Sequence, residues 1–249
     1  MFHSKKELIF IALAMFFAAD AITAELIGGK LINLHIFGSD YTFSIGVIPW
    51  PIVFIATDVI NEFYGKKGVR RLSFITAGLI AYAYLVLFAA MNVKASPVSQ
   101  ISDEMFRNVF GTSMWLIIGS LVAFVSSQLI DNSVFWLLRK YTGHSMIWLR
   151  STGSTLVSQF FDTALVLGVG FWLPAKLYPD QYHFTTATYM NIVGTQYVFK
   201  VSIAILATPL VYLGHGVIVK ILGHQHAHQI IEETARNSLG EDYDKKGKK

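Results

Sequence analysis

The chain has 249 residues, of which 53% are hydrophobic and only 14% are charged, and its mean hydropathy is +0.49. Because a soluble domain carries about 25% charged residues, this composition excludes an ordinary soluble protein and indicates a chain that has lipid as its solvent. The sequence contains no cysteine, which excludes a disulfide framework and a thiolate metal site. The net charge of +4 is modest, and no nucleic-acid partner is expected.

Long apolar runs predict an all-α integral membrane protein with six transmembrane helices. About 20 residues are needed to cross a hydrocarbon core of about 30 Å. The run from Leu8 to Ile27 is interrupted only by Asp20 and Glu25, and the run from Leu72 to Met91 contains no charge. The length of the first run and its two carboxylates favour a retained helix over a cleaved secretory signal. The predicted spans, in chain order, are 8–28, 43–63, 72–92, 113–138, 152–173 and 188–214.

The segments between the spans are short and contain residues that break helices. Two prolines near residue 50 are expected to bend or open the second span near its start. The run Gly65-Lys66-Lys67-Gly68 is expected to form a tight basic turn. Residues 94–110 are polar and predict an external loop or a short interfacial helix. Residues 1–222 are therefore predicted to form one six-helix transmembrane domain, and residues 223–249 a polar cytoplasmic tail.

The distribution of positive charge predicts the orientation of the chain. If the chain crosses the membrane six times, 15 of its 20 Lys and Arg side chains fall on the side of the N-terminus. Four fall on the other side, and Lys200 lies inside the last span. Loops rich in Lys and Arg stay on the cytoplasmic side of a membrane. Both termini are therefore predicted to lie in the cytoplasm.

Ionisable and amide side chains inside the spans are the strongest functional signal. A charged group near the bilayer centre costs several kcal/mol unless it is paired or solvated. The motif Ser-Gln-x-x-Asp occurs at 127–131 and again at 158–162, and residues three apart share one helix face. We expect such residues to line a polar cavity that binds a ligand, although polar side chains also hold helices together in membranes. The predicted substrate-binding residues are Asp162, Gln159, Asp131, Gln128, Lys200, Gln196, Asn191 and Asp20.

Four further polar residues are expected closer to a membrane surface. Asp58, Asn61 and Glu62 precede the basic turn and are predicted to organise a cytoplasmic gate. Glu25, near the end of the first span, is assigned with them as a gate or structural polar residue. For the three carboxylates, snorkelling or hydrogen bonding at a helix end is an equally good explanation.

The chemistry of the predicted cavity fits a nucleobase-like ligand better than a reaction. A carboxylate accepts two parallel N–H donors, a glutamine offers both a donor and an acceptor, and aromatic rings supply stacking. We find no protease, hydrolase or P-loop motif and expect neither enzymatic activity nor a cofactor. The three histidines at 224, 226 and 228 lie in the polar tail and are expected to be solvated, so no metal site is predicted.

One segment resembles a known family. Residues 56–67, Ala-Thr-Asp-Val-Ile-Asn-Glu-Phe-Tyr-Gly-Lys-Lys, are similar to the queuosine precursor transporter family, also described as a vitamin uptake transporter family. The two Ser-Gln-x-x-Asp motifs, the run 22–25 with Lys30, and the stretch 191–200 match the rest of that pattern. The resemblance covers Leu8 to Gly214. It implies import of 7-cyano-7-deazaguanine or 7-aminomethyl-7-deazaguanine, a deazapurine substrate, through the cytoplasmic (inner) membrane of a bacterium for queuosine modification of tRNA.

Other functions remain compatible with the sequence. The chain has the size of a substrate-capturing membrane subunit of an energy-coupling-factor-like vitamin uptake system, which needs a partner ATPase. The sequence is also compatible with a helical scaffold in which the polar pairs only hold helices together, or with a membrane enzyme. The expected partners are the deazapurine substrate and the lipid bilayer, and a homodimer is also compatible with so small a bundle. The sequence decides neither the preferred precursor nor proton coupling.

Overall fold

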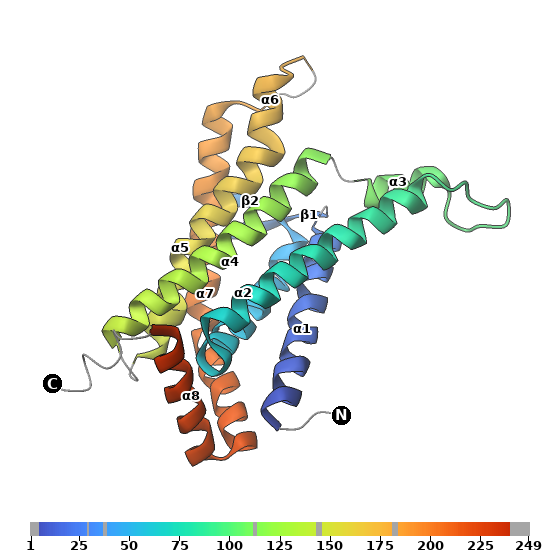
Figure 1. The fold of residues 1–249 in the computed structure, drawn as a ribbon. Coiled ribbons are helices and arrows are strands. Elements are labelled where there is room, and N and C mark those ends of the chain that lie inside the picture. Colours follow the sequence, from blue (N-terminus) through green and yellow to red (C-terminus); the bar gives the residue numbers. More distant parts are fainter. Residues whose placement is uncertain are drawn as a thin grey trace.

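The computed structural model describes residues 5–28, 30–36, 39–111, 114–142, 146–180 and 184–239. They form a bundle of long helices with one small β-hairpin (Figure 1). The elements are α1 Lys5–Ile27, β1 Leu31–Ile36, β2 Ser39–Ser44, a 3-10 turn Ile45–Val47, α2 Trp50–Met91, α3 Asp103–Phe110, α4 Met114–Thr142, α5 Ile147–Leu167, a π-helical segment Gly168–Trp172, α6 Leu173–Leu177, α7 Thr186–Leu222 and α8 His224–Leu239.

Within the described residues, five helical stretches are long and apolar enough to cross a membrane. They are Lys5–Ile27, Trp50–Met91, Asp103–Thr142, Ile147–Leu177 and Thr186–Leu222. The predicted helical membrane class is therefore confirmed. The antiparallel pair β1–β2 was not predicted, and only its last two residues, Phe43 and Ser44, belong to the predicted second span. That span begins at Trp50, where the prolines fit because the first turn of a helix needs no backbone N–H donors.

Helix α2 folds back on itself at Gly65, the one residue within it that has non-helical backbone angles. Thr57 and Ser73, eight residues before and after this break, both donate hydrogen bonds to Oε1 of Gln128, over 3.5 and 3.4 Å. The first arm, residues 50–64, therefore runs antiparallel to the second arm, residues 66–91. These arms correspond to the predicted spans 43–63 and 72–92. The sequence predicted a turn of four residues, 65–68, whereas in the structure only Gly65 departs from helical geometry.

Glycine is required at this break for two reasons. Its φ of 78° lies in the left-handed region that side chains with a Cβ rarely adopt. A Cβ there would also lie 2.8 Å from Ser238 Oγ and 3.0 Å from Thr234 Cγ2, both on α8. Thr234 Oγ1 donates to the carbonyl oxygen of Phe63 over 3.0 Å, so α8 satisfies a backbone acceptor that the break leaves without a helical donor.

Helix α8 lies within the segment that was expected to be a polar tail. Its buried residues recur at helical spacing and pack against α2 and the end of α7. The buried positions are Ala227, Ile230, Ile231, Thr234 and Ala235. The start of this segment is thus an amphipathic helix that covers the Gly65 break.

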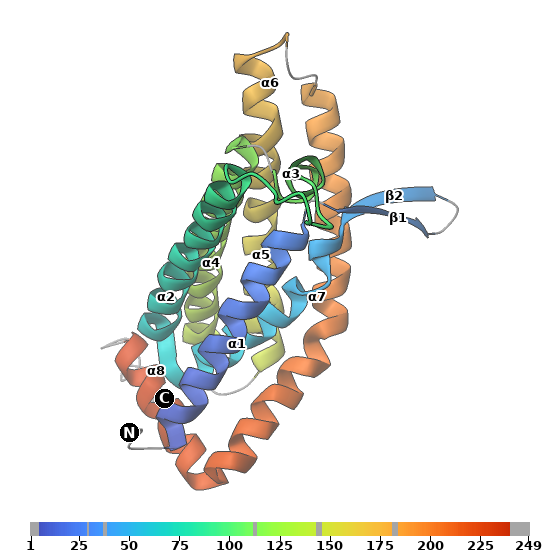
Figure 2. The same ribbon diagram turned by 90° about the vertical axis from the view of Figure 1, so that its right-hand side faces the viewer.

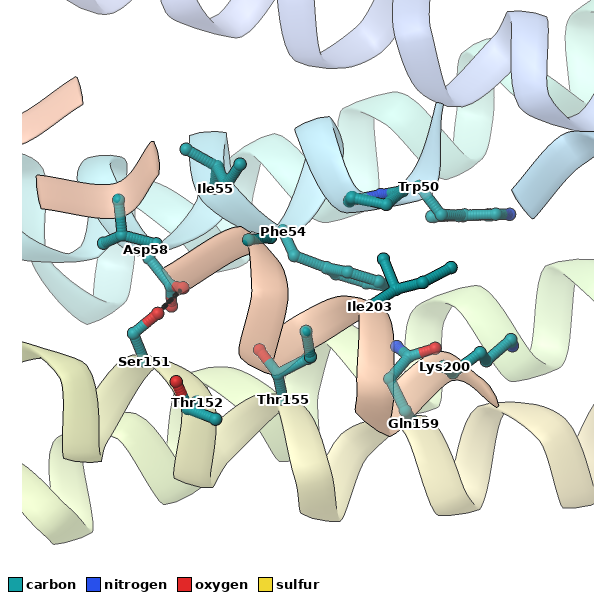
Figure 3. Close-up of a pocket in the computed structure, with 14 residues that line it drawn as sticks. Trp50, Phe54, Ile55, Asp58, Ser151, Thr152, Thr155, Gln159, Lys200 and Ile203 are labelled. Carbon is teal, nitrogen blue, oxygen red and sulfur yellow. Dashed lines mark hydrogen bonds between the residues drawn. The ribbon is translucent and has the colours of Figure 1, made fainter. Parts of the chain in front are cut away.

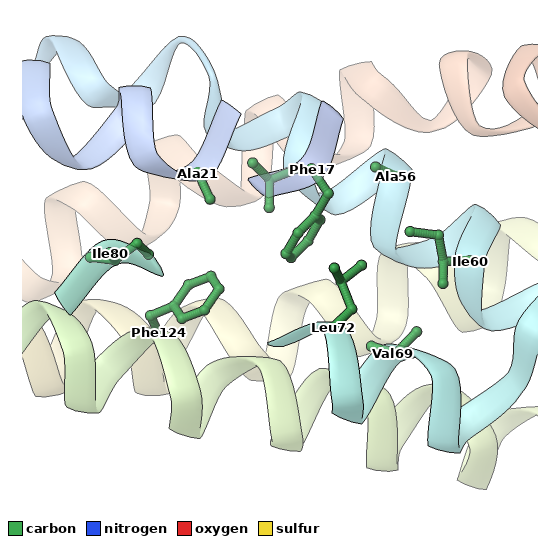
Figure 4. Close-up of a cluster of buried hydrophobic side chains, with 9 residues drawn as sticks. Phe17, Ala21, Ala56, Ile60, Val69, Leu72, Ile80 and Phe124 are labelled. Atoms are coloured by element: carbon green, nitrogen blue, oxygen red, sulfur yellow. The ribbon is translucent and has the colours of Figure 1, made fainter. Parts of the chain in front are cut away.

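The main apolar core lies between α1, both arms of α2 and α4 (Figure 4). Small residues such as Ala21 and Ala56 let the helices approach closely, as is usual for helices packed in membranes. The full cluster is Phe17, Ala21, Val53, Ala56, Ile60, Val69, Leu72, Ile80 and Phe124. This core holds the first arm of α2 in position, and the opposite side of that arm faces α7 and the start of α5.

A buried ion cluster joins the first arm of α2 to α4 and α5. Glu62 contacts the guanidinium of Arg139, and it accepts hydrogen bonds from Arg150 Nη2 over 2.9 and 3.0 Å. Arg139 and Arg150 are 2% and 0% exposed, and they stack on the rings of Trp136 and Phe135. The prediction of orientation from loop charges counted both arginines among the residues of the loops, whereas in the structure both are buried.

We predict that Gly65→Ala lowers the free energy of unfolding by about 1–2 kcal/mol or more, because alanine is strained at positive φ and its Cβ meets α8. Gly78→Ala is the matched control: Gly78 lies in the second arm with open space around it, and alanine there should stabilise the helix slightly. Thermal unfolding of the purified variants in detergent measures both. Equal effects of the two substitutions would contradict this account of the break.

Glu62→Gln should destabilise the protein by about 3–5 kcal/mol, because it removes a buried anion that two buried guanidinium groups contact. Glu104→Gln, which changes an exposed carboxylate on α3, should alter stability by no more than about 0.5 kcal/mol. The comparison uses thermal unfolding at one pH. If the two variants are equally stable, the cluster does not hold α2 to α4 and α5.

Candidate functional site

A cavity lies between the first arm of α2, α5 and α7 (Figure 3). About 460 Å³ of space between its walls is free of protein atoms, and this space includes part of the open surroundings. Side chains at helical spacing on three helices form its walls. The wall positions are Trp50, Phe54 and Asp58 on α2, Ser151, Thr155 and Gln159 on α5, and Lys200, Ala204, Ala207 and Val211 on α7.

These spacings explain why the lining is mixed. Residues four apart point to the same face of a helix, so one face of α2 presents two aromatic rings and then the Asp58 carboxylate. The corresponding face of α5 presents two hydroxyl groups and then the Gln159 amide. Helix α7 contributes small and branched apolar residues with Lys200 at one end. The cavity thus combines aromatic surface with a carboxylate, an amide and an ammonium group.

Two buried acceptor atoms of the lining residues have no hydrogen-bond partner among the described residues. Asp58 is 4% exposed; Ser151 Oγ donates to its Oδ2, and its Oδ1 is without a donor. Gln159 is 2% exposed, and its Oε1 also lacks a donor. Leaving a buried acceptor unsatisfied costs about 1–3 kcal/mol. A ligand that brings N–H donors into the cavity would remove this cost.

Lys200 is held in place by Asp162. Its Nζ lies 2.7 Å from Asp162 Oδ2, and the pair is mostly buried. Asp162 does not line the cavity itself. Glu25 lies near enough to interact electrostatically with both, and it accepts hydrogen bonds from Ser120 and, over 3.3 Å, from Tyr84. The structure therefore places Glu25 half-buried between α1, the second arm of α2 and α4, with its carboxylate bonded to Ser120 and Tyr84.

The other predicted site residues do not line the cavity. Gln128 joins the two arms of α2, and Asp131 on α4 accepts a hydrogen bond from Ser158 over 3.2 Å. Asn191 is exposed and bonds to Thr195 within α7. The remaining positions are Gln196 and Asp20, which are half-buried, Asn61, which accepts from Trp136 Nε1 over 3.1 Å, and Glu62 in its ion cluster.

The structure thus brings together Gln159 and Lys200 from the predicted binding set with Asp58 from the predicted gate. Ser151 and Thr152 also line the cavity, and the sequence reasoning did not select them. The spacing of Ser151, Thr155 and Gln159 at intervals of four was the signal that could have identified the first of these. Among the described residues, no group of three His, Cys, Asp or Glu side chains is arranged to hold a metal ion.

Comparisons with known proteins agree with a membrane transporter. Residues 44–214 match the family model described as "Putative vitamin uptake transporter". A protein of Bacillus subtilis (strain 168) named "Probable queuosine precursor transporter" is 30% identical over 72% of this chain and 74% of its own length. No solved structure matches the chain.

Two further relatives carry the same kind of name. The "Queuosine precursor transporter" of Escherichia coli (strain K12) is 30% identical over 65% of this chain and 67% of its own length. The "Probable queuosine precursor transporter" of Haemophilus influenzae (strain ATCC 51907 / DSM 11121 / KW20 / Rd) is 24% identical over 74% of this chain and 72% of its own length. With its bundle of apolar helices and the match over most of its length, the chain belongs to the vitamin uptake transporter family that includes the proteins named queuosine precursor transporters.

Proposed function

We propose that this chain imports a queuosine precursor, 7-cyano-7-deazaguanine or 7-aminomethyl-7-deazaguanine, through the inner membrane of a bacterium for modification of tRNA. The names of three relatives support the class of substrate. The observation that carries the proposal is the pair of unsatisfied acceptors, Asp58 Oδ1 and Gln159 Oε1, in a cavity with two aromatic rings. A deazaguanine has a flat ring that can stack on these aromatic rings, and it has an edge rich in N–H donors that can satisfy the two acceptors.

In the proposed topology, residues 1–222 form the transmembrane domain and cross the membrane six times. The N-terminus and residues 223–249 lie on the cytoplasmic side. Two contacts support this topology. Tyr64 Oη donates to the carbonyl oxygen of Lys6 over 2.7 Å, and α8 contacts the Gly65 break, so all three segments lie at one end of the bundle. The β-hairpin, α3 and α6 lie toward the other end (Figure 2). The first end carries most of the Lys and Arg side chains.

The donor edge of the base is proposed to face Asp58 and Gln159. A deazaguanine carries an N1–H and a 2-amino group side by side, and a carboxylate or amide oxygen can accept from such groups. The ring would stack near Trp50 and Phe54, whose own rings lie 5.8 Å apart at an angle of 18°. Aromatic stacking supplies affinity, whereas the two acceptors select the guanine-like edge.

Lys200 is proposed to meet the carbonyl oxygen of the base. An ammonium group has three donors and no acceptor, and Asp162 uses one of them at 2.7 Å. Asp162 is thus a positioning residue that aims the ammonium into the cavity. For an aminomethyl substrate, a second carboxylate would provide the countercharge, because the aminomethyl group lies on the carbonyl side of the base, away from the edge that faces Asp58.

The decisive assay uses cells that cannot make queuosine precursors, supplied with a low concentration of 7-cyano-7-deazaguanine, with queuosine measured in their tRNA. Asp58→Asn and Gln159→Leu should each lower uptake at least about tenfold, because a well-placed polar contact is worth about 1–3 kcal/mol of discrimination. Asn191→Ala is the control, since that exposed amide lies outside the cavity. If Asn191→Ala abolishes uptake and Gln159→Leu does not, the site lies elsewhere.

Asp162→Asn should also abolish uptake while leaving the protein folded, because Lys200 then loses the anion that orients it. The amount of protein in the membrane and its thermal unfolding show whether the variant folds. Normal uptake by Asp162→Asn would remove this residue from the site. Uptake by the unaltered chain that requires a partner ATPase would instead support the substrate-capturing subunit of an energy-coupling-factor-like system.

A further inference from the structure

One turn of α5 joins the other two walls of the cavity at the end that lies toward the Gly65 break. In this turn Ser151 Oγ donates to the carboxylate of Asp58 on α2. The next residue, Thr152, has its Oγ1 2.8 Å from Thr208 Oγ1 on α7. Figure 3 shows Asp58, Ser151 and Thr152 gathered at one end of the cavity. These contacts close that end.

The two lines along which α2 meets its neighbours are held firmly at this end. Between α2 and α5, Glu62 accepts hydrogen bonds from the buried guanidinium of Arg150 over 2.9 and 3.0 Å. Between α2 and α7, Gly214 lies so close that a Cβ on it would be 3.2 Å from Val59 Cγ2. Opening the first contact would separate a buried ion pair, and opening the second would expose apolar side chains to the water of an open cavity.

The line along which α5 meets α7 is held at this end by neutral hydrogen bonds. One is the Thr152–Thr208 bond, and in the other the backbone N–H of Trp148 donates to Tyr212 Oη over 3.4 Å. A hydrogen bond between neutral groups contributes less to stability than one between charged groups. The contact of α5 with α7 is therefore the one that opens most easily at this end.

Helix α7 contains a proline directly after Thr208. Pro209 has no N–H to donate to the carbonyl oxygen of Ile205, and its ring bends a helix over the preceding turn. Thr208 Oγ1 also donates to the carbonyl oxygen of Ala204 over 3.2 Å, a contact that favours bending. Since its hydrogen is used there, Thr152 is the donor in the pair with Thr208. In Figure 2, α7 changes direction on its way to α8.

The helices that α7 contacts also change along its length. Before Pro209, Tyr189 and Tyr197 donate to backbone carbonyl oxygens of α5 over 3.0 and 3.1 Å. After it, Ile218 and Val219 pack in the apolar cluster that α7 shares with α2 and α8. We propose that residues 206–222 of α7 are the cytoplasmic gate of the cavity. They swing away from α5 at the Pro209 bend while they stay packed on α2, and the Thr152–Thr208 bond holds the gate closed.

This inference rests on the proposed function, to which it adds the step that releases the substrate. Asp58, the proposed partner of the base, lies at the closed end, and Ser151, which bonds to it, is next to Thr152 in the chain. When α7 separates from α5 there, the base gains a path from Asp58 toward the side of the bundle where α8 lies. In the proposed topology that side is the cytoplasm.

A reversible cross-link tests the gate, because the chain contains no cysteine of its own. Thr152→Cys combined with Thr208→Cys replaces two oxygens 2.8 Å apart by sulfurs, which form a disulfide at about 2 Å. The purified variant in lipid vesicles should lose transport of labelled 7-cyano-7-deazaguanine on oxidation and regain it with a reductant. Binding of the compound should persist in the oxidised form. Thr208→Cys alone is the control, and oxidation should not change its transport.

Transport that survives complete cross-linking overturns the proposal. Loss of binding together with transport in the oxidised form also overturns it, because the cross-link would then act on the binding site. If the unaltered chain does not transport the compound, the proposed substrate is wrong, and a measurement without substrate decides on the gate.

That measurement uses pulsed electron paramagnetic resonance between two nitroxide labels on introduced cysteines. One label replaces the exposed Leu137 on α4, and the other replaces the exposed Leu213, which follows the bend in α7. Thr208→Val removes the hydroxyl that holds the gate and should lengthen the distance between these labels. The distance from Leu137 to the exposed Val198, which precedes the bend, should not change. An unchanged distance to Leu213, or equal shifts of both distances, contradicts the gate whatever the substrate is.

Discussion

Glu62 lies where the first arm of α2 meets α4 and α5, and its single carboxylate contacts both Arg139 and Arg150. When buried within a protein, neither an isolated carboxylate nor an isolated guanidinium is tolerated, so this contact requires the three helices to meet at one point. The Gly65 break lies three residues further along, and α8 covers it. The position of the first arm, and with it that of Trp50, Phe54 and Asp58 in the cavity, depends on this cluster.

The buried polar residues of the bundle differ in whether their hydrogen bonds are satisfied within the described chain, and unsatisfied atoms occur both in the cavity lining, at Asp58 and Gln159, and outside it, as at Asn61. Gln128 is surrounded by hydroxyl donors of both arms of α2, whereas Gln159, in the same motif on the next helix, has an unsatisfied oxygen. Satisfied groups hold helices together. Unsatisfied groups beside an open space are those that a ligand can bind, which is why Gln159 and Asp58 carry the proposed site.

Much of the fold follows from the sequence, because apolar runs of about 20 residues have few alternatives to a membrane helix. The two arms of α2 and the break at Gly65 were expected on these grounds. Arg139 and Arg150 were assigned to a loop. Their burial could not be predicted, because the carboxylate that they contact, Glu62, lies 77 and 88 residues away in the sequence. The hairpin at 31–44 and the packing of α8 depend on contacts with distant segments. For the site, periodicity showed which residues share a helix face but not whether that face meets another helix or the cavity.

The central claim is that the cavity recognises the edge of the base that carries the N–H donors. A ligand that lacks one of these donors tests the claim most directly. The measurement is equilibrium binding of 7-cyano-7-deazaguanine to the purified chain in lipid nanodiscs, compared with an analogue that lacks only the 2-amino group. The account predicts that the analogue binds at least about tenfold more weakly, because one buried acceptor then stays unsatisfied, and that Asp58→Asn narrows this difference. Equal binding of the two compounds by the unaltered chain would contradict the account.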